Sequence, residues 1–512
     1  MFNLKGASWE ARLSRDLPAS LVVFLVAIPL CMGIAIASGV SPEKGLITGI
    51  VGGLIVGIFS GSPLQVSGPA AGLVVIVFEL VQQNGIGMLG PILMLAGLIQ
   101  LLAGALKIGQ VFRAISPAVV HGMLAGIGVL IVASQLHVIF DAKPLPNGLA
   151  NLMAAPNRLL NLFPLNNSSD ALLVGACTIT AMLGWEKLRP AALRLVPGAL
   201  VGVIVGTALA QVAALPVKFV TMPESLIGSF TYPTLANLSA LASPPMLLSA
   251  VTVAFIASAE TLLSAAAVDR MHDGARTSYN RELAAQGLGN LLCGALGALP
   301  MTGVIVRSSA NVQAGAVSRL STVLHGAWIL MAVAALPFVL ELVPLSALAG
   351  VLLLAGIRLM DLRHGRHLLK VHGWRPAAIW MATFVTVVAT DLLTGVLVGV
   401  ALSALELIPH LPRLGLHIHK YPAAVGQMDV ELIGTGTFVK LPQLLAALSE
   451  VPDGCAVRLK MSRLRHIDHT FAEILAEWIR RRRGIGWRVT LDDSRGMHAT
   501  HGGLRELIAA PD

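Results

Sequence analysis

Long apolar runs separated by short polar or basic loops fill most of this chain. The runs do not alternate apolar and polar residues, so they are typical of helices rather than strands. Seven are predicted in the first half, at 17–38, 44–60, 67–82, 90–107, 117–139, 170–185 and 196–215. After a polar, proline-rich stretch, seven more are predicted, at 246–264, 282–299, 303–315, 321–342, 345–358, 376–391 and 394–411.

The third run of each set is short and follows a break rich in proline and glycine. The first break is 'SGPAAG' (Ser67–Gly72), and the second is 'LPMTGV' (Leu299–Val304). Short, interrupted hydrophobic segments at matching positions of two halves indicate the binding site of an inverted-repeat transporter. An odd number of spans in each half gives the two halves opposite orientations across the membrane.

The pattern changes near residue 412. Beyond it, predicted strands and helices alternate, as in 'AVRLKMSRL' (456–464) followed by 'HTFAEILAEWIRRRRG' (469–484). This alternation is typical of a small α/β domain. We therefore expect a membrane transport domain over 1–412 and a small cytoplasmic domain over 413–512. The arginines at the end of 469–484 are interpreted as a solvated or lipid-facing helix end.

Composition supports a polytopic α-helical membrane protein. The 512 residues are 55% hydrophobic and 12% charged, whereas soluble domains carry about 25% charged residues. With 51 glycines and 5% aromatic residues, the helices are expected to pack with their backbones in close contact. The net charge of +9 lies mainly in loops beside the runs and in the tail. That pattern places both termini in the cytoplasm, and we expect no nucleic-acid partner.

The two breaks predict an anion site. Pro69 suits the first turn of a helix, so a half-helix is expected to begin there, with free N–H groups at Ala70, Ala71 and Gly72. The absence of a side chain at Gly68 leaves room for close approach. In the second break, Pro300 and Gly303 precede a segment that begins near Val304. Two facing half-helix N-termini would carry partial positive charge and attract an anion.

Two full charges lie in apolar runs near these breaks. Arg307 follows the second break; because a buried arginine is costly, it marks a functional site and would bind an oxyanion through two hydrogen bonds. The alternative is a structural ion pair with Glu260. Glu260 is a candidate carrier of a proton or ligand of sodium, and Ser264, one turn further on, shares its face. His121, His137 and His325, near segment ends, are interpreted as structural.

In this order, four motifs resemble those of the sulfate permease (SulP) family of anion transporters. The motifs are 'VAIPLCMGIAIASGVSPEKGL' (Val26–Leu46), 'QVSGPAAGL' (Gln65–Leu73), 'SAETLLSA' (Ser258–Ala265) and 'LPMTGVIVRSSANVQAG' (Leu299–Gly315). The tail resembles the STAS domain that ends most members. The resemblance implies a fold of seven plus seven inverted segments, a core subdomain that moves against a gate subdomain, and a homodimer.

The resemblance also implies where the anion binds. The implied substrate-binding residues are Ala70, Ala71, Gly72, Gly303, Val304, Ile305 and Arg307, with structural breaks at Gly68, Pro69 and Pro300. Glu260 matches the acidic position of the eighth segment. In sodium-coupled bicarbonate members this position resembles an aspartate sodium ligand followed four residues later by threonine; here the pair is Glu260 and Ser264.

The chain departs from the family pattern at two places. Leu30 follows Pro29 where many members have a glutamate or glutamine, which implies a more apolar site wall. Asp468-His469-Thr470-Phe471 stands where STAS domains often read Asp-Ser-Ser-Gly, which argues against a phosphorylation switch there. A dimer-supporting or regulatory role is expected for the tail.

We therefore expect a secondary active transporter of bicarbonate or sulfate in a bacterial-type inner membrane, coupled to protons or sodium through Glu260. The alternatives are an exchanger of chloride, bicarbonate, sulfate or dicarboxylates, and a nucleobase transporter of the same fold class. Arg307 and the lack of a second carboxylate there argue against the nucleobase. No HExxH motif supports an intramembrane enzyme. No cofactor and no metal other than the sodium considered for Glu260 are expected.

Overall fold

The computed structural model describes residues 9–492 with internal gaps. The residues outside the description are 1–8, 110–115, 146–147, 161–166, 194–195, 223–226, 273, 361, 372, 391, 408–414, 425–426, 438–439, 453, 485–486 and 493–512. The expected domain boundary at residue 412 therefore lies outside the described residues.

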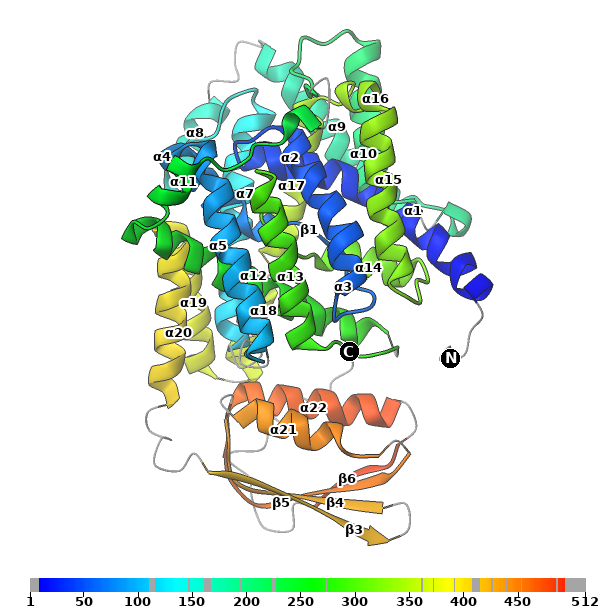
Figure 1. Cartoon of the computed structure of the whole chain (residues 1–512), viewed down its shortest axis with the longest axis vertical. Helices are drawn as coiled ribbons and strands as arrows, with labels where there is room; N and C mark the ends of the chain where they lie inside the picture. Colours follow the sequence, from blue (N-terminus) through cyan, green and yellow to red (C-terminus); the bar gives the residue numbers. More distant parts are fainter. Residues whose placement is uncertain are drawn as a thin grey trace. The chain divides into compact units, whose positions relative to one another are not determined.

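The first half of the described chain forms helices over each of its predicted runs (Figure 1). These are α1 (Trp9–Ala37), α2 (Pro42–Val51) continued by the π-helical η1 (Gly52–Val56) and by α3 (Gly57–Phe59), the 3-10 turn η2 (Ala71–Leu73) with α4 (Val74–Asn84), α5 (Ile86–Ala105), α7 (Pro117–Ile139), α9 (Asn167–Leu188) and α10 (Gly198–Val212).

The second half repeats this plan. Its segments are α12 (Pro244–Met271), α13 (Tyr279–Ala295), α14 (Ile305–Gln313), α15 (Leu320–Ala335), α17 (Leu345–Leu359), α19 (Trp374–Ala389) and α20 (Leu392–Leu407). Short helices connect the segments of both halves and the stretch between them: α8 (Gly148–Leu160), η3 (Ala191–Leu193), η4 (Ile227–Ser229), α11 (Leu235–Ala240), α16 (Pro337–Glu341) and α18 (Leu362–Val371). The prediction of seven plus seven segments is confirmed.

Among the described residues, six helices are long and apolar enough to cross a membrane by length and composition. Several others are apolar but shorter, and α4 and α14, which follow the two breaks, span only 11 and 9 residues. The short third segment of each half is therefore a half-helix, as the sequence predicted.

The chain divides into two compact units. One comprises 1–109, 126–360 and 388–393, and contains both breaks; the other comprises 110–125, 361–387 and 394–512. In the second unit, Ala118 and Val119 at the start of α7 share an apolar cluster with Ile379 and Trp380 of α19.

Helices α5 and α13 pack with their backbones in contact, as the glycine content predicted. A Cβ atom at Gly97 would lie 2.3 Å from the Leu291 nitrogen, and one at Gly287 would lie 2.4 Å from the Leu101 nitrogen. Gly90 and Gly294 approach each other in the same way. Small residues allow this approach, which strengthens dispersion contacts between helices that lack a hydrophobic driving force in lipid.

Replacing Gly97 with alanine is expected to destabilise the protein by about 1–3 kcal/mol, because the new methyl group would force these two backbones apart. Thermal unfolding of the purified protein in detergent checks this. Gly184, in α9, is the matched control, because a Cβ atom there would meet nothing within 4 Å. Equal stability of the two variants would contradict the packing.

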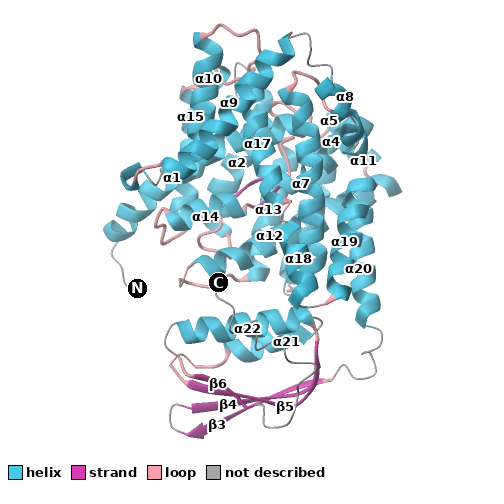
Figure 2. Cartoon of the chain, turned by 180° about the vertical axis from the view of Figure 1, so that it is seen from behind, coloured by secondary structure: helices cyan, strands magenta, loops and turns pink. Residues whose placement is uncertain are grey.

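The C-terminal residues form a four-stranded sheet in the order β3-β4-β5-β6, with helices on one face (Figure 2). The elements are β3 (Leu416–Ala424), β4 (Gln427–Gly436), α21 (Leu441–Ser449), β5 (Ala456–Ile467), α22 (His469–Gly484) and β6 (Val489–Asp492). β3 and β4 are antiparallel, whereas β5 is parallel to β4 and β6. Leucines and valines of the sheet pack with Leu444 and Leu475 of the helices in one apolar core, so the predicted α/β character is confirmed.

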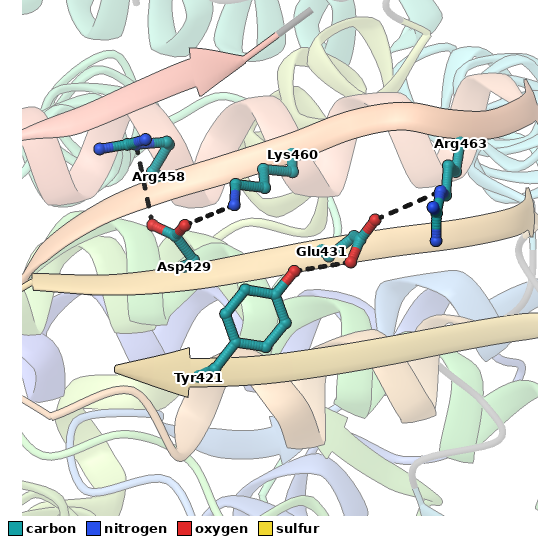
Figure 3. Close-up of polar contacts among 6 residues, drawn as sticks. All are labelled: Tyr421, Asp429, Glu431, Arg458, Lys460 and Arg463. Carbon is teal, nitrogen blue, oxygen red and sulfur yellow. Dashed lines mark hydrogen bonds and ion pairs between the residues drawn. The ribbon is translucent and has the colours of Figure 1, made fainter. Parts of the chain in front are cut away.

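The other face of this sheet carries interlocked charges (Figure 3). Asp429 and Glu431 alternate with buried Val430 and Leu432 along β4. Lys460 Nζ lies 2.7 Å from an Asp429 carboxylate oxygen, and this hydrogen bond raises the pKa of Lys460. The remaining partners are Arg458 beside Asp429, and Arg463 and Tyr421 beside Glu431. Each acidic side chain is thus flanked by a cation.

The start of α22 explains one departure from the STAS pattern. Asp468 Oδ1 accepts the Phe471 N–H at 2.8 Å, so this aspartate caps the helix. Gly436, opposite, has no side chain and leaves space for the Phe471 ring, which would lie 2.8 Å from a Cβ atom there. The Thr470 side chain lies outside the described residues.

The arginine run at the end of α22 is more than a solvated helix end. The Arg482 guanidinium lies 3.8 Å from the Trp487 ring centroid and 5.6 Å from that of Trp478. Arg483 donates two hydrogen bonds to the Val489 carbonyl. Arg483 is exposed and Arg482 is half-buried, and cation–π contacts and these hydrogen bonds also hold the chain that leads into β6.

Candidate functional site

The two breaks lie side by side in the first unit. Ser67–Pro69 forms strand β1 and Met301–Gly303 forms strand β2, and the two pair antiparallel with Gly68 opposite Thr302. Figure 1 labels β1 among the surrounding helices. Because α4 and α14 each begin just after one of these strands, the pairing brings the starts of both half-helices to one place. This juxtaposition was expected from the sequence.

One N–H group that the sequence predicted to be free, that of Ala70, is occupied, and so are two in the second break. Ala70 donates its N–H to the Pro300 carbonyl at 3.3 Å, and Val304 donates to Val66 at 2.9 Å. The Gly303 N–H donates to Thr261 Oγ1 at 3.2 Å. The backbone groups of a buried strand pair must form hydrogen bonds. These donors are therefore used within the protein and are not free.

The first turn of α14 carries two exposed side chains. Ile305 and Val306 are 38% and 55% exposed, although Val304 before them is half-buried and Arg307 after them is buried. In the first half, Ala71 is half-buried and Gly72 is buried. An anion in front of α14 would therefore meet the partial positive charge of its N-terminus.

Arg307 is fully buried, and its guanidinium has no hydrogen-bond partner at any of its three nitrogens. It lies against the first break, since a Cβ atom at Gly68 would be 2.1 Å from a terminal nitrogen of the guanidinium. A side chain at Gly68 would therefore displace the guanidinium. A buried, unpaired charge is costly, and an anion would supply the missing acceptors.

Glu260, on α12, also lies against the first break, near the start of α4. A Cβ atom at Gly72 would be 2.8 Å from Glu260 Oε2. The Gly72 backbone and the Thr302 side chain both interact with the Glu260 carboxylate. Glu260 Oε2 and Thr302 Oγ1 are both buried without a hydrogen-bond partner. Ser264, one turn further along α12, is buried as well.

Arg307 and Glu260 do not form the ion pair that was the alternative interpretation. With all guanidinium nitrogens unpaired, Arg307 contacts Gly68, whereas Glu260 contacts Gly72. Both charges therefore lie against the first break, at two different glycines. Among the described residues, no group of three or more His, Cys, Asp or Glu side chains could hold a metal ion.

Polar side chains that the sequence analysis did not single out hold the breaks in place. Asn290 of α13 bonds both the N–H (2.8 Å) and the carbonyl (3.1 Å) of Met301. Thr48 of α2 bonds both backbone groups of Leu299, at 2.9 and 3.0 Å. Gln65 donates to the Thr261 carbonyl at 3.1 Å and lies over Gly303. Their only sequence signal is a lone polar residue in or beside an apolar segment.

A buried carboxylate fixes the approach to β1. Glu282, fully buried on α13, accepts hydrogen bonds from the Ser60 hydroxyl, the Ser62 N–H and the Gln286 amide. Gln286 also donates to the Ser67 hydroxyl at 2.5 Å. Because its acceptors are satisfied, Glu282 is a structural group, in contrast to Glu260.

Sequence comparisons point to one family. The sequence profile of the Sulfate permease family matches residues 13–383. A candidate sulfate transporter, YvdB of Bacillus subtilis (strain 168), is 32% identical over 400 residues, which cover 77% of this chain and 73% of YvdB. The bicarbonate transporter BicA of Picosynechococcus sp. is 26% identical over 421 residues, 78% of this chain and 71% of BicA.

Solved structures show the same fold. The transmembrane domain of a cyanobacterial BicA superimposes with a TM-score of 0.66 at 25% identity, covering 75% of this chain and 97% of that domain. The murine anion transporter Slc26a9, in its inward-facing state, gives a TM-score of 0.69 at 16% identity over 99% of this chain and 88% of that one. The predicted polytopic fold of seven plus seven inverted segments with a small α/β tail is confirmed.

Proposed function

Because this chain belongs to the sulfate permease family, we propose that it carries a small inorganic oxyanion, sulfate or bicarbonate, by secondary active transport with alternating access. Anion transport and an integral membrane location follow from that membership, and the named relatives are transporters rather than enzymes. The finer proposal is that the anion binds where the two half-helices begin, near Ala71, Gly72, Ile305 and Arg307.

The observation that supports this proposal most is the unpaired guanidinium of Arg307. It is a full positive charge beside the strand pair, and two half-helix N-termini add partial positive charge at the same place. A neutral nucleobase gains little from such a site, whereas an oxyanion can accept hydrogen bonds from the planar guanidinium in pairs.

We further propose that uptake is coupled to protons or sodium through Glu260, with Ser264 beside it. An exchanger of chloride, bicarbonate, sulfate or dicarboxylates is the alternative, and in that case Glu260 would not carry a coupling ion. An inner-membrane location with both termini in the cytoplasm, and a homodimer, complete the proposal. The charge distribution of the loops supports the orientation.

Labelled sulfate and labelled bicarbonate uptake into proteoliposomes, with sodium and proton gradients imposed separately, tests the function. Uptake of one anion that follows one gradient would identify the substrate and the coupling ion together. Uptake only against a trapped counter-anion would establish exchange. No uptake of either anion under any gradient would contradict the proposal.

The C-terminal domain, proposed as STAS-like over 413–512, is expected to support activity without choosing the substrate. A chain ending at residue 415 should take up the anion more slowly than the full chain, with the sulfate-to-bicarbonate ratio unchanged, because none of the proposed site residues lies in the tail. Paired uptake of both anions measures this. A changed ratio would show that the division into domains is wrong.

A further inference from the structure

The short helix α18 connects the membrane segments α17 and α19. Two segments, α19 and α20, follow it before the C-terminal domain begins. Because these two segments cross the membrane once in each direction, α18 and the C-terminal domain lie on the same side of the membrane. In the proposed orientation this side is the cytoplasm.

One face of α18 is buried against membrane segments. Leu368 is fully buried in the apolar cluster formed by α7 and α19. Gly365, one turn earlier, lies against the Trp380 ring of α19, since a Cβ atom there would be 2.9 Å from a ring carbon. Residues three apart share a helix face, so α18 is docked by this face on the ends of the segments.

The opposite face of α18 is basic. Arg363, Arg366 and Lys370 are exposed, and their spacing of three and four residues aligns them in one row along the helix. At 3.6 residues per turn, this row lies on the side away from the buried face. Arg375, at the start of α19, is exposed as well. Together these four side chains form a basic surface.

The basic surface has no acidic partner within the described part of the chain, because none of the ion pairs between described side chains includes any of its four cations. Arg358, just before α18, shows the contrast, since it pairs with Glu186 of α9. Between residues 359 and 389 the sequence holds one acidic residue, Asp361, which lies outside the described residues. The charge of the surface is thus available to an anionic partner.

Large apolar side chains are exposed beside these cations. Leu369 is 55% exposed and Trp374 is 70% exposed, and the Arg375 guanidinium lies 6.0 Å from the Trp374 ring centroid. Tryptophan is enriched at the level of the lipid headgroups, where long basic side chains also extend toward the phosphates. Cations and exposed apolar groups side by side are typical of a helix that lies in the membrane interface.

We propose that the basic surface binds the headgroups of anionic phospholipids in the leaflet on the side of the C-terminal domain. The guanidinium groups donate paired hydrogen bonds to phosphate oxygens, while Leu369 and Trp374 contact the upper part of the acyl chains. A zwitterionic lipid also has a phosphate, but its own ammonium group offsets the charge, so anionic lipids are preferred. The inference does not depend on which anion is transported, because the surface contains none of the proposed substrate-binding residues.

Quenching of tryptophan fluorescence by brominated lipids tests this on the full chain in a neutral detergent. Brominated phosphatidylglycerol should quench at a much lower mole fraction than brominated phosphatidylcholine, and Trp374→Phe should remove most of this difference. Arg363→Gln combined with Arg366→Gln should raise the half-saturating fraction of phosphatidylglycerol about 25-fold, at about fivefold for each cation lost. The control is Arg458→Gln combined with Arg463→Gln, which removes the same charge from cations that have acidic partners and should change nothing.

Three results would overturn the inference: equal quenching by the two lipids, a preference for phosphatidylglycerol that survives the double variant, or an equal loss in the control. Inorganic phosphate, compared with sodium chloride at the same ionic strength, should not reverse the quenching; reversal would mean that a soluble anion occupies the surface instead of a lipid. If the double variant does not fold, Lys370→Gln combined with Arg375→Gln gives the same comparison. Failure of the proposed function is distinct, because it is measured by uptake and not by lipid binding.

Discussion

Replacing Arg307 with alanine is expected to abolish anion uptake, by at least about a hundredfold, while the protein still folds. The guanidinium is buried and has no hydrogen-bond partner, so its donors are left unsatisfied in the absence of anion. Losing one partner of a buried charge pair typically costs about 2–5 kcal/mol, or about thirtyfold to several thousandfold in affinity, and the expected loss lies within this range. Uptake of labelled sulfate and bicarbonate by equal amounts of reconstituted protein measures it.

The stability of Arg307→Met distinguishes a ligand from a structural ion pair. Methionine fills a similar volume without charge, so it removes the penalty of burying an unpaired cation. The anion-free variant should unfold at the same or a higher temperature than the unmodified protein, and added anion should no longer stabilise it. The control is Arg358→Met, because Arg358 pairs with Glu186 at 2.5 Å at the end of α17. Normal uptake by Arg307→Ala, or a large loss of stability in Arg307→Met, would exclude the assignment.

The segments and both breaks could be predicted from the sequence because they depend on local patterns. A helix must satisfy its own backbone in lipid, so the apolar runs translate directly into the fourteen membrane segments. Proline and glycine in 'SGPAAG' and 'LPMTGV' interrupt the helices at matching positions, and the structure has the strands β1 and β2 there. Repeat symmetry was enough to expect that the two breaks meet.

The details of the site could not be predicted, because they depend on pairs distant in sequence. Whether the Ala70 N–H is free depends on Pro300, and whether Asn290 matters depends on its reach to Met301. The relation of Glu260 to Arg307 was left open for the same reason: each is an intramembrane charge, and only the fold shows that they contact different glycines. Likewise, nothing local shows that Arg482 stacks on Trp487.

Glu260 illustrates how an unsatisfied acceptor defines a function to test. Glu282 and Glu260 are both carboxylates of the core helices, yet Glu282 accepts hydrogen bonds from three residues, whereas Glu260 Oε2 accepts none and lies near the equally unpaired Thr302 hydroxyl. A buried carboxylate in that position needs a proton or a cation. The difference supports the proposal that Glu260 takes part in coupling, whereas Glu282 is structural.

Replacing Glu260 with glutamine is expected to remove the dependence of uptake on the coupling gradient, with a loss of about tenfold or more in gradient-driven uptake. Glutamine keeps the size of the side chain but carries no negative charge at any pH, so it neither takes up a proton nor holds sodium. Initial uptake rates under separate sodium and proton gradients measure this, compared with rates under no gradient. Exchange of labelled for unlabelled anion at equilibrium should be retained, because Arg307 and the half-helix N-termini are intact.

The matched control is Glu186→Gln, since Glu186 is a partly exposed carboxylate paired with Arg358 and should not affect coupling. Glu260→Asp then separates the two ions: a carboxylate one methylene shorter can still be protonated, but a sodium ion demands oxygen ligands at fixed distances. Sodium coupling would therefore be weakened by aspartate, while proton coupling would persist. A Glu260→Gln protein whose uptake still follows the same gradient would exclude Glu260 from coupling, and its role would then be to offset the partial positive charge at the start of α4 through Gly72.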